Sequence, residues 1–222
     1  MTSPFAKTIL PTPLIPAVLL AGGKASRMGG GDKSLRLLAG RPLLGHVIQR
    51  LKPQVRDLVI NANGDSGRFA EFGLPVVPDE IVGQPGPLAG ILAGLDWAAT
   101  QCSGAEYVLS VPTDCPFLPV DLTQHLMEAA RSGAEIAIAA SNGRLHPVIG
   151  LWRVSLHNDM RRAMGVENLR KVRVFSDRYR TAVVNFPSIV NLPGGAADPF
   201  FNANTPEDLA FAEGLLHGPA AE

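Results

Sequence analysis

Apolar residues recur along the chain in two alternating patterns. Short continuous runs, such as residues 17–20 and 107–111, predict buried strands, whereas apolar residues three and four positions apart, as in 42–52, predict helices. The predicted strands are 17–20, 55–60, 76–77, 107–111, 134–139, 148–152 and 182–186. The predicted helices are 42–52, 67–72, 88–95, 122–130, 155–164 and one that starts at Pro206. This order predicts an α/β fold, a three-layer Rossmann-like domain with a mostly parallel central sheet and helices on both faces.

Two C-terminal segments have distinct local signals. Thr205 followed by Pro206 and two acidic residues is typical of a helix start, because the hydroxyl caps the first turn and acids favour the positive helix end. The glycine-rich stretch 191–198 predicts a mobile loop.

The first predicted strand leads into a loop in which five glycines alternate with cations over residues 22–33. Glycine permits positive φ and a close approach of the backbone to a ligand. Successive amide N–H groups in such a loop form a concave anion site, and Arg27 and Lys33 add donors suited to phosphate oxygens. The loop therefore predicts a nucleoside triphosphate site, with a flexible surface loop as the alternative.

Two widespread phosphate-binding motifs are excluded. A P-loop needs lysine directly after its last glycine, but Asp32 separates Gly31 from Lys33. The dinucleotide fingerprint G-x-G-x-x-G also fails, because residues 24–26 after Gly22-Gly23 are Lys, Ala and Ser.

Polar residues follow several predicted strands, where ligands of open α/β sheets bind. Asp114 comes soon after the strand 107–111, and its carboxylate suits Mg²⁺, which takes one or two carboxylates together with substrate phosphates. Asn61 and Asp79 also follow short strands. Each of the three has an alternative interpretation as a turn residue.

Further polar candidates lie late in the chain. Arg144 and His146 are expected in a polar loop before the strand 148–152, and Arg170-Lys171 forms a basic pair. Asn202 and Asn204 alternate around one alanine, so an extended segment would point both side chains the same way. The alternatives are a structural histidine, a solvated helix face and a turn-and-cap pair, respectively.

Bulk properties limit the class of protein. The 222 residues fit a leader (1–15), one domain (16–217) and a short tail (218–222). Twenty Lys and Arg balance twenty Asp and Glu, so no global field favours nucleic acid or an anionic membrane. The two cysteines have no metal-site or disulfide spacing, which favours a reducing cytoplasm. No apolar run reaches the ~20 residues that span a bilayer, and early prolines disfavour a signal peptide.

Six motifs match those of a known family in order. They are residues 20–33, Asn61-Ala62-Asn63, Pro78-Asp79, Gly86-Pro87-Leu88-Ala89-Gly90, Pro112-Thr113-Asp114-Cys115-Pro116 and Asn202-Ala203-Asn204-Thr205-Pro206-Glu207. The opening loop resembles that of GT-A-type nucleotidyltransferases, and the set as a whole resembles the molybdenum cofactor guanylyltransferase family. The resemblance spans residues 17 to about 216.

The resemblance implies roles for particular residues. It implies catalytic roles for Arg27, Lys33 and Asp114, with Asp114 holding Mg²⁺. The implied nucleotide-binding residues are Leu20, Ala21, Gly22, Gly23, Lys33, Asn61, Asp79 and Asp114. The implied acceptor-binding residues are Arg144, His146, Arg170, Lys171, Asn202 and Asn204. Relatives often carry two arginines where this chain has Arg170-Lys171.

The implied reaction is the Mg²⁺-dependent transfer of GMP from GTP to the terminal phosphate of molybdopterin, which releases pyrophosphate. No protein nucleophile is evident, and the acceptor phosphate is itself anionic near neutral pH because its second pKa is ~6. Molybdenum-insertion and molybdoenzyme-maturation proteins are the implied partners. The alternatives are a cytidylyltransferase for the same acceptor, a sugar-1-phosphate nucleotidyltransferase and a non-catalytic GTP-binding delivery protein.

Overall fold

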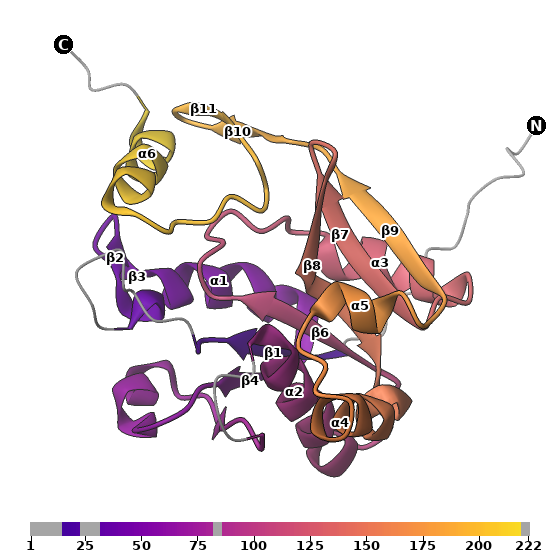
Figure 1. Ribbon diagram of the computed structural model, residues 1–222. Coiled ribbons are helices and arrows are strands. Elements are labelled where there is room, and N and C mark those ends of the chain that lie inside the picture. The colour runs from indigo at the N-terminus through magenta and orange to yellow at the C-terminus, as the bar shows by residue number, and fades with distance from the viewer. Residues whose placement is uncertain (1–14, 23–31, 82–85, 219–222) are drawn as a thin grey trace, which may run out of the picture.

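A computed structural model of the chain describes residues 15–22, 32–81 and 86–218 (Figure 1). These residues form a seven-stranded sheet in the order β5-β4-β1-β6-β8-β7-β9. Its strands are β1 (Ile15–Leu20), β4 (Val55–Asn61), β5 (Val76–Val77), β6 (Tyr107–Pro112), β7 (Ile136–Ser141), β8 (Arg144–Arg153) and β9 (Thr181–Phe186). The α-helices are α1 (Leu43–Leu51), α2 (Pro87–Gln101), α3 (Leu122–Arg131), α4 (His157–Gly165), α5 (Val172–Ser176) and α6 (Pro206–His217).

Shorter elements complete the description. The 3₁₀ helices are η2 (Lys33–Leu35), η3 (Lys52–Gln54), η4 (Ser66–Phe72) and η5 (Val154–Leu156). Two small antiparallel sheets pair β2 (Leu37–Leu38) with β3 (Arg41–Pro42) and β10 (Ile189–Leu192) with β11 (Gly195–Ala197). The helix predicted at 67–72 is the 3₁₀ helix η4, and every other predicted strand and helix is present. The largest differences are that α2 extends beyond the predicted 88–95 to Gln101 and that β8 begins at Arg144 instead of residue 148.

The predicted mostly parallel sheet is confirmed. The pairs β1–β4, β1–β6, β4–β5 and β7–β9 are parallel, and β8 runs antiparallel to both of its neighbours, β6 and β7. Because side chains alternate along a strand, β1 supplies Leu19 to the core under α1 and α3 and Val18 to the core under α2, α4 and α5. Figure 1 shows α5 in front of the sheet and α3 behind it.

The position of Arg144 and His146 differs from the sequence expectation. They do not lie in a loop before residues 148–152, because β8 already begins at Arg144. Asn142 and Gly143 have φ values of 48° and 74°, which suits the tight hairpin that joins β7 to β8. An Asn-Gly pair is itself typical of a hairpin turn. The turn places Arg144 and His146 on β8, beside the end of β7.

The glycine-rich stretch 191–198 is also ordered differently from the expected mobile loop. Most of it forms the β10–β11 hairpin, which packs beside α6 (Figure 1). The N–H of Gly194 donates to the carbonyl of Leu215 at 3.0 Å. A Cβ at Gly194 would overlap the carbonyl oxygen of Gly214, so glycine is required for this close approach of two backbones.

The predicted limits of the leader, the domain and the tail stay predictions, because both ends of the chain lie outside the described residues. Residues 1–14 and 219–222 lie outside the described residues, and β1 begins at Ile15, the last residue of the predicted leader. Among the helices that the structure describes, none combines the length and the apolar character needed to cross a membrane.

Close contact between α2 and β1 yields a test of the packing. A Cβ at Gly94 of α2 would lie 2.5 Å from Cγ1 of Val18, and Val18 is fully buried. We expect Gly94→Ala to lower the free energy of unfolding by about 1–3 kcal/mol through overpacking. Gly214→Ala in α6 is the matched control, since nothing lies within 4 Å of its added Cβ. Urea denaturation should show no loss of stability in the control, because alanine favours helix.

Candidate active site

The carboxyl ends of three neighbouring parallel strands meet at one edge of the sheet. Leu20, the last residue of β1, lies opposite Asn61 of β4 and Pro112 of β6. The N–H of Ala21 donates to the carbonyl of Asn61 at 2.9 Å, and the Thr113 hydroxyl donates to the carbonyl of Leu20 at 3.4 Å. The chain that leaves β1 therefore starts between the polar segments that follow β4 and β6.

A cationic side chain joins two of the predicted site residues. The Lys33 ammonium donates to the Asp114 carboxylate and to the side-chain oxygen of Asn204. The side chains of Lys33 and Asp114 are 12% and 17% exposed, so water screens this ion pair only weakly. Asp32 caps the 3₁₀ helix η2, which begins at Lys33, by accepting from the N–H of Ser34 at 3.0 Å. Three residues that are distant in sequence thus form one cluster after β6.

The segment of Asn202 and Asn204 is tied to the loop after β6. The N–H of Ala203 donates to the carbonyl of Asp114 at 3.0 Å, and the Cys115 thiol donates to Oδ1 of Asn202 at 2.8 Å. Burial raises the pKa of Cys115 well above its usual value, and the Asp114 charge acts in the same direction, so the thiol keeps its proton. The side-chain oxygen of Asn202 therefore accepts from the Cys115 thiol, whereas that of Asn204 accepts from the Lys33 ammonium.

The predicted helix start that follows is confirmed. Thr205 and Asp208 form a capping box on α6, in which the Thr205 hydroxyl accepts from the N–H of Asp208 at 3.2 Å. The Asp208 carboxylate accepts from the N–H groups of Thr205 at 2.9 Å and Asn204 at 2.7 Å. The cap thus fixes the backbone that carries Asn204.

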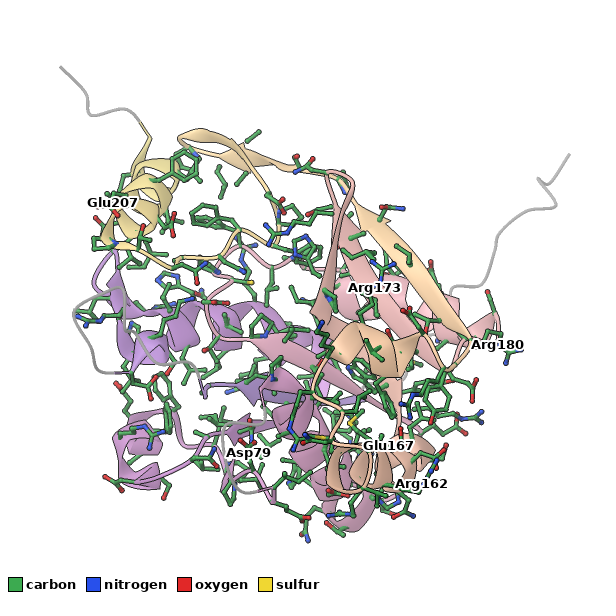
Figure 2. All side chains as sticks on the ribbon, viewed as in Figure 1. Asp79, Arg162, Glu167, Arg173, Arg180 and Glu207 are labelled. Carbon is green, nitrogen blue, oxygen red and sulfur yellow. The ribbon has the colours of Figure 1, made fainter. Side chains whose placement is uncertain are left out.

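A second cluster surrounds Asp79, which lies in the lower part of the view, well separated from Glu207 of α6 at the upper left (Figure 2). Asn61 donates to Oδ1 of Asp79 at 2.9 Å, and Asn63 donates to Oδ2 at 2.8 Å. The Asn63 side-chain oxygen accepts from the N–H of Asp79 at 2.8 Å. Asn61 is only 4% exposed, so Oδ1 of the carboxylate is held by a buried partner, whereas Oδ2 is held by the exposed Asn63.

The glycine of the Gly-Pro-Leu-Ala-Gly segment makes room for this cluster. A Cβ at Gly90 would overlap Oδ1 of Asn61 and lie 2.7 Å from Cδ2 of Leu20. Gly86, before the first turn of α2, has a φ of 71°, which favours glycine. The motif therefore lets the start of α2 lie directly against the ends of β1 and β4.

Arg68 is a site-building residue that the sequence did not indicate. Its guanidinium donates to Asp32 at 2.9 Å and to the carbonyl of Asn63 at 2.8 Å. It thereby connects the turn that carries Lys33 to the segment that positions Asp79. Nothing in the local sequence signals this role, because its partner Asp32 is 36 positions away.

Asp198 is a second residue that the sequence reasoning missed. Its carboxylate accepts from the Ser141 hydroxyl at 2.7 Å, from the side chain of Asn142 at 3.1 Å and from the N–H of Phe200 at 2.8 Å. Burial raises the pKa of Asp198, but these hydrogen bonds and His146 outweigh it and hold the pKa below its usual value. The carboxylate therefore ties the β7–β8 hairpin to the chain that leads toward Asn202.

The predicted cations late in the chain have different environments. Arg144 is exposed at the start of β8, and Lys171 is exposed just before α5. Arg170 is half-buried, and one terminal nitrogen of its guanidinium donates to the carbonyls of Met164 at 2.8 Å and Leu169 at 2.9 Å. At least part of the role of Arg170 is thus to hold the end of α4.

The cluster after β6 contains oxygen atoms of the kind that a hard metal cation prefers as ligands. The Asp114 carboxylate and the Asn204 amide oxygen already converge on one positive charge, the Lys33 ammonium. Within residues 15–22, 32–81 and 86–218, no three His, Cys, Asp or Glu side chains group together as a metal site. One carboxylate with neutral oxygens suits a divalent cation that also binds substrate phosphates.

Part of the glycine-rich loop after β1 lies outside the described residues. Leu20, Ala21 and Gly22 lie at the strand ends described above, whereas Gly23 and Arg27 lie outside the described residues. The roles predicted for these five residues stay predictions.

Solved structures with this fold are known. The structure resembles molybdopterin-guanine dinucleotide biosynthesis protein A from Archaeoglobus fulgidus, with 23% identity, a TM-score of 0.66, and coverage of 90% of this chain and 97% of that one. It also resembles 4-diphosphocytidyl-2C-methyl-D-erythritol synthase from Anaerococcus prevotii, with 15% identity, a TM-score of 0.67, and coverage of 91% and 96%. At these identities the likeness shows the fold.

Sequence relatives are much closer. Molybdenum cofactor guanylyltransferases of a Bradyrhizobium species and of Rhodopseudomonas palustris are 55% and 57% identical to this chain. The first match covers 92% of this chain and 94% of the relative, and the second covers 90% and 93%. The family model for the MobA-like NTP transferase domain matches residues 17–181. The chain therefore belongs to the MobA-like NTP transferase family and, within it, to the molybdenum cofactor guanylyltransferases.

Proposed function

We propose that this protein transfers GMP from GTP to the terminal phosphate of molybdopterin, giving molybdopterin guanine dinucleotide and pyrophosphate. The observation that carries the proposal is the convergence of Lys33, Asp114 and Asn204 after β6, beside the chain that leaves β1. In support of the proposal, these oxygens suit a divalent cation and this ammonium suits phosphate, and they lie at the strand ends where ligands bind in such sheets. The names of relatives at 55% and 57% identity support the same reaction.

Asp79 is the residue that we propose recognises the guanine base. Its two oxygens are oriented by Asn61 and Asn63 and can each accept a further hydrogen bond. Guanine offers a ring N–H and an exocyclic amine side by side, which matches a fixed carboxylate, whereas adenine does not. We infer that Asn61 and Asn63 stop the carboxylate from rotating and so sharpen the choice of base.

Asp114 and Asn204 are the proposed ligands of Mg²⁺. When bound, Mg²⁺ would neutralise charge on the phosphates of GTP. Lys33 occupies the meeting point of these two oxygens, so its ammonium has to swing toward the phosphates when the nucleotide arrives. We infer that Lys33 then acts with Arg27 and the backbone amides of residues 20–23 to stabilise the charge that develops during transfer.

The transfer itself needs no protein nucleophile. A phosphate oxygen of the acceptor attacks the α-phosphorus of GTP, the bond from that phosphorus to the bridging oxygen breaks, and pyrophosphate leaves with the electron pair. The protein positions the two anions and lowers their repulsion, which is how phosphoryl-type transfers are commonly catalysed. We place Arg144, His146, Arg170, Lys171 and Asn202 on the acceptor side. We expect the reaction in the cytoplasm, with delivery of the product to molybdoenzyme-maturation proteins.

Base choice gives the first test. The enzyme is supplied with molybdopterin, Mg²⁺ and each ribonucleoside triphosphate in turn, and the dinucleotide formed is identified. We expect a preference for GTP over ATP and CTP of roughly 10⁴, because a polar site rejects an analogue that leaves it unpaired. Asp79→Asn should lower kcat/KM for GTP by about 10- to 100-fold, the effect of one hydrogen bond to a charged group.

The control for that substitution is Asp57→Asn, since Asp57 pairs with Arg56 at the surface and its side chain is 43% exposed. Equal use of CTP and GTP by the wild type would favour the cytidylyltransferase alternative. GTP binding without release of pyrophosphate would favour the delivery protein.

The metal site gives the second test. Asp114→Asn keeps the shape of the side chain and one oxygen but removes the charge. We expect kcat/KM to fall by about 10²–10³-fold, a magnitude typical of losing one group that stabilises developing charge. Asp121→Asn is the control, because the Asp121 side chain is 51% exposed and makes no capping hydrogen bond. Full activity of Asp114→Asn at ordinary Mg²⁺ concentration would reduce Asp114 to a turn residue.

The basic pair on the acceptor side gives the third test, because its two members have different surroundings. Arg170→Ala should lower the free energy of unfolding by about 1–2 kcal/mol, since the carbonyl of Met164 in the last turn of α4 and that of Leu169 beyond it lose a charged donor. Lys171→Ala should leave stability unchanged and raise the apparent KM for molybdopterin by about fivefold or less, as expected for an exposed cation.

Separate titrations of GTP and acceptor check this contrast. The Kd for GTP should stay within about threefold in Lys171→Ala, because an exposed cation typically contributes about 1 kcal/mol or less. A loss confined to GTP would move Lys171 to the nucleotide side.

A further inference from the structure

Three side chains form a continuous hydrogen-bonded row on the acceptor side. The Asp198 carboxylate contacts the Ser141 hydroxyl at 2.7 Å, and the same hydroxyl contacts Nε2 of His146 at 2.8 Å. Ser141 is the last residue of β7 and is 1% exposed, so water does not compete for its hydroxyl. None of the six motifs of the family resemblance contains Asp198 or Ser141.

The direction of each hydrogen bond follows from the number of available protons. Asp198 also accepts from the N–H of Phe200 and from Asn142, and these donors keep its carboxylate ionised. An ionised carboxylate can only accept, so Ser141 has to give it the one hydroxyl proton. The hydroxyl oxygen then has only lone pairs for His146, and Nε2 has to be the donor.

This arrangement determines which nitrogen of the His146 ring is the acceptor. Burial and Arg144 lower the pKa of His146, and the Asp198 charge opposes them without reversing the shift, so the ring is neutral near pH 7. A neutral imidazole with its proton on Nε2 has its lone pair on Nδ1. Within the described ranges, no side chain or backbone group is hydrogen-bonded to that Nδ1.

Packing contacts through Phe200 link this row of side chains to the cluster after β6. The ring of Phe200 lies 4.8 Å from the ring of His146, and Phe200 is 2% exposed. The carbonyl of Phe200 is 3.8 Å from the Cys115 thiol, next to Asp114. His146 is therefore packed against the segment that continues into Asn202 and Asn204, rather than standing on an independent loop.

We propose that Asp198 is a positioning residue that acts through the Ser141 hydroxyl to fix His146 as the Nε2–H tautomer, so that Nδ1 accepts a hydrogen bond from an N–H group of the heterocyclic acceptor substrate. An acceptor nitrogen repels phosphate oxygens, so His146 binds the pterin ring system and leaves the terminal phosphate to the cations. The identity of this ligand rests on the proposed function, whereas the tautomer does not.

The tautomer is tested without any substrate. Nitrogen-15 NMR of the histidine rings, with the His146 signals assigned from their loss in His146→Gln, should show the proton on Nε2 in the wild type near pH 7.5. Ser141→Ala should relax this preference to the mixture that a free neutral histidine shows, in which Nε2–H is the major form and Nδ1–H is also present. A wild-type ring protonated on Nδ1, or an unchanged preference in Ser141→Ala, would overturn the proposal. Asp198→Asn should weaken the preference, and Ser141→Ala decides the question if that variant fails to fold.

The ligand is tested with a matched pair of substitutions. In glutamine the amide nitrogen lies as many bonds from Cβ as Nε2, so His146→Gln retains a donor for Ser141 and lacks Nδ1. In asparagine the amide oxygen lies as many bonds from Cβ as Nδ1, so His146→Asn retains an acceptor there. We expect His146→Gln to raise the apparent KM for molybdopterin by about 3- to 10-fold, the effect of one neutral hydrogen bond, and His146→Asn to raise it less.

The two arms separate the possible failures. The Kd for GTP should stay within about threefold in both His146 variants, and an equal or larger acceptor defect in His146→Asn would overturn the assignment of Nδ1 to the acceptor. If the wild type forms no dinucleotide with any triphosphate, the proposed function and the ligand assignment fail together. The NMR result for Ser141→Ala still decides the tautomer in that case.

Discussion

The parallel register of β4, β1 and β6 is the constraint on which the rest of the site depends. It places Leu20 opposite both Asn61 and Pro112, so the segments that follow three separate strands start at the same edge of the sheet. Because parallel strands all present their carboxyl ends there, the polar residues of distant motifs become neighbours without any local signal between them. Glycines at positions 90 and 94 allow α2 to lie against this edge, and larger residues would push it away.

The charged groups at this edge are held by packing more than by one another. Lys33 and Asp114 form a poorly exposed pair, and removing such a pair from water costs free energy that their attraction only partly offsets. Neighbouring main-chain hydrogen bonds, such as that from Ala203 to Asp114, supply the missing stabilisation. The main chain of such a site is organised before a ligand arrives, which reduces the entropy that binding has to overcome.

One segment of the described chain joins the cluster after β6 to the β7–β8 hairpin. The C-terminal chain passes from Asp198 through Phe200 to Asn202 and Asn204, and it contacts the β7–β8 hairpin at one end and the loop after β6 at the other. The connection is therefore held at both ends by hydrogen bonds and ring packing. The α6 capping box and the β10–β11 hairpin brace this connection from outside the sheet. Late segments of the chain thus complete a site that the early motifs begin.

Hydrophobic periodicity and cap chemistry by themselves determined the order of strands and helices, the position of Asp114 after β6 and the start of α6 at Pro206, because these signals are local. The Asn142-Gly143 pair is also a local signal, but the sequence analysis did not use it and expected Arg144 and His146 in a loop. Only the tertiary structure decided the partners of Arg68 and Asp198, which lie 36 and 57 positions from Asp32 and Ser141. Such contacts depend on strand register and helix packing, and no local pattern encodes which distant groups that packing brings within hydrogen-bonding distance.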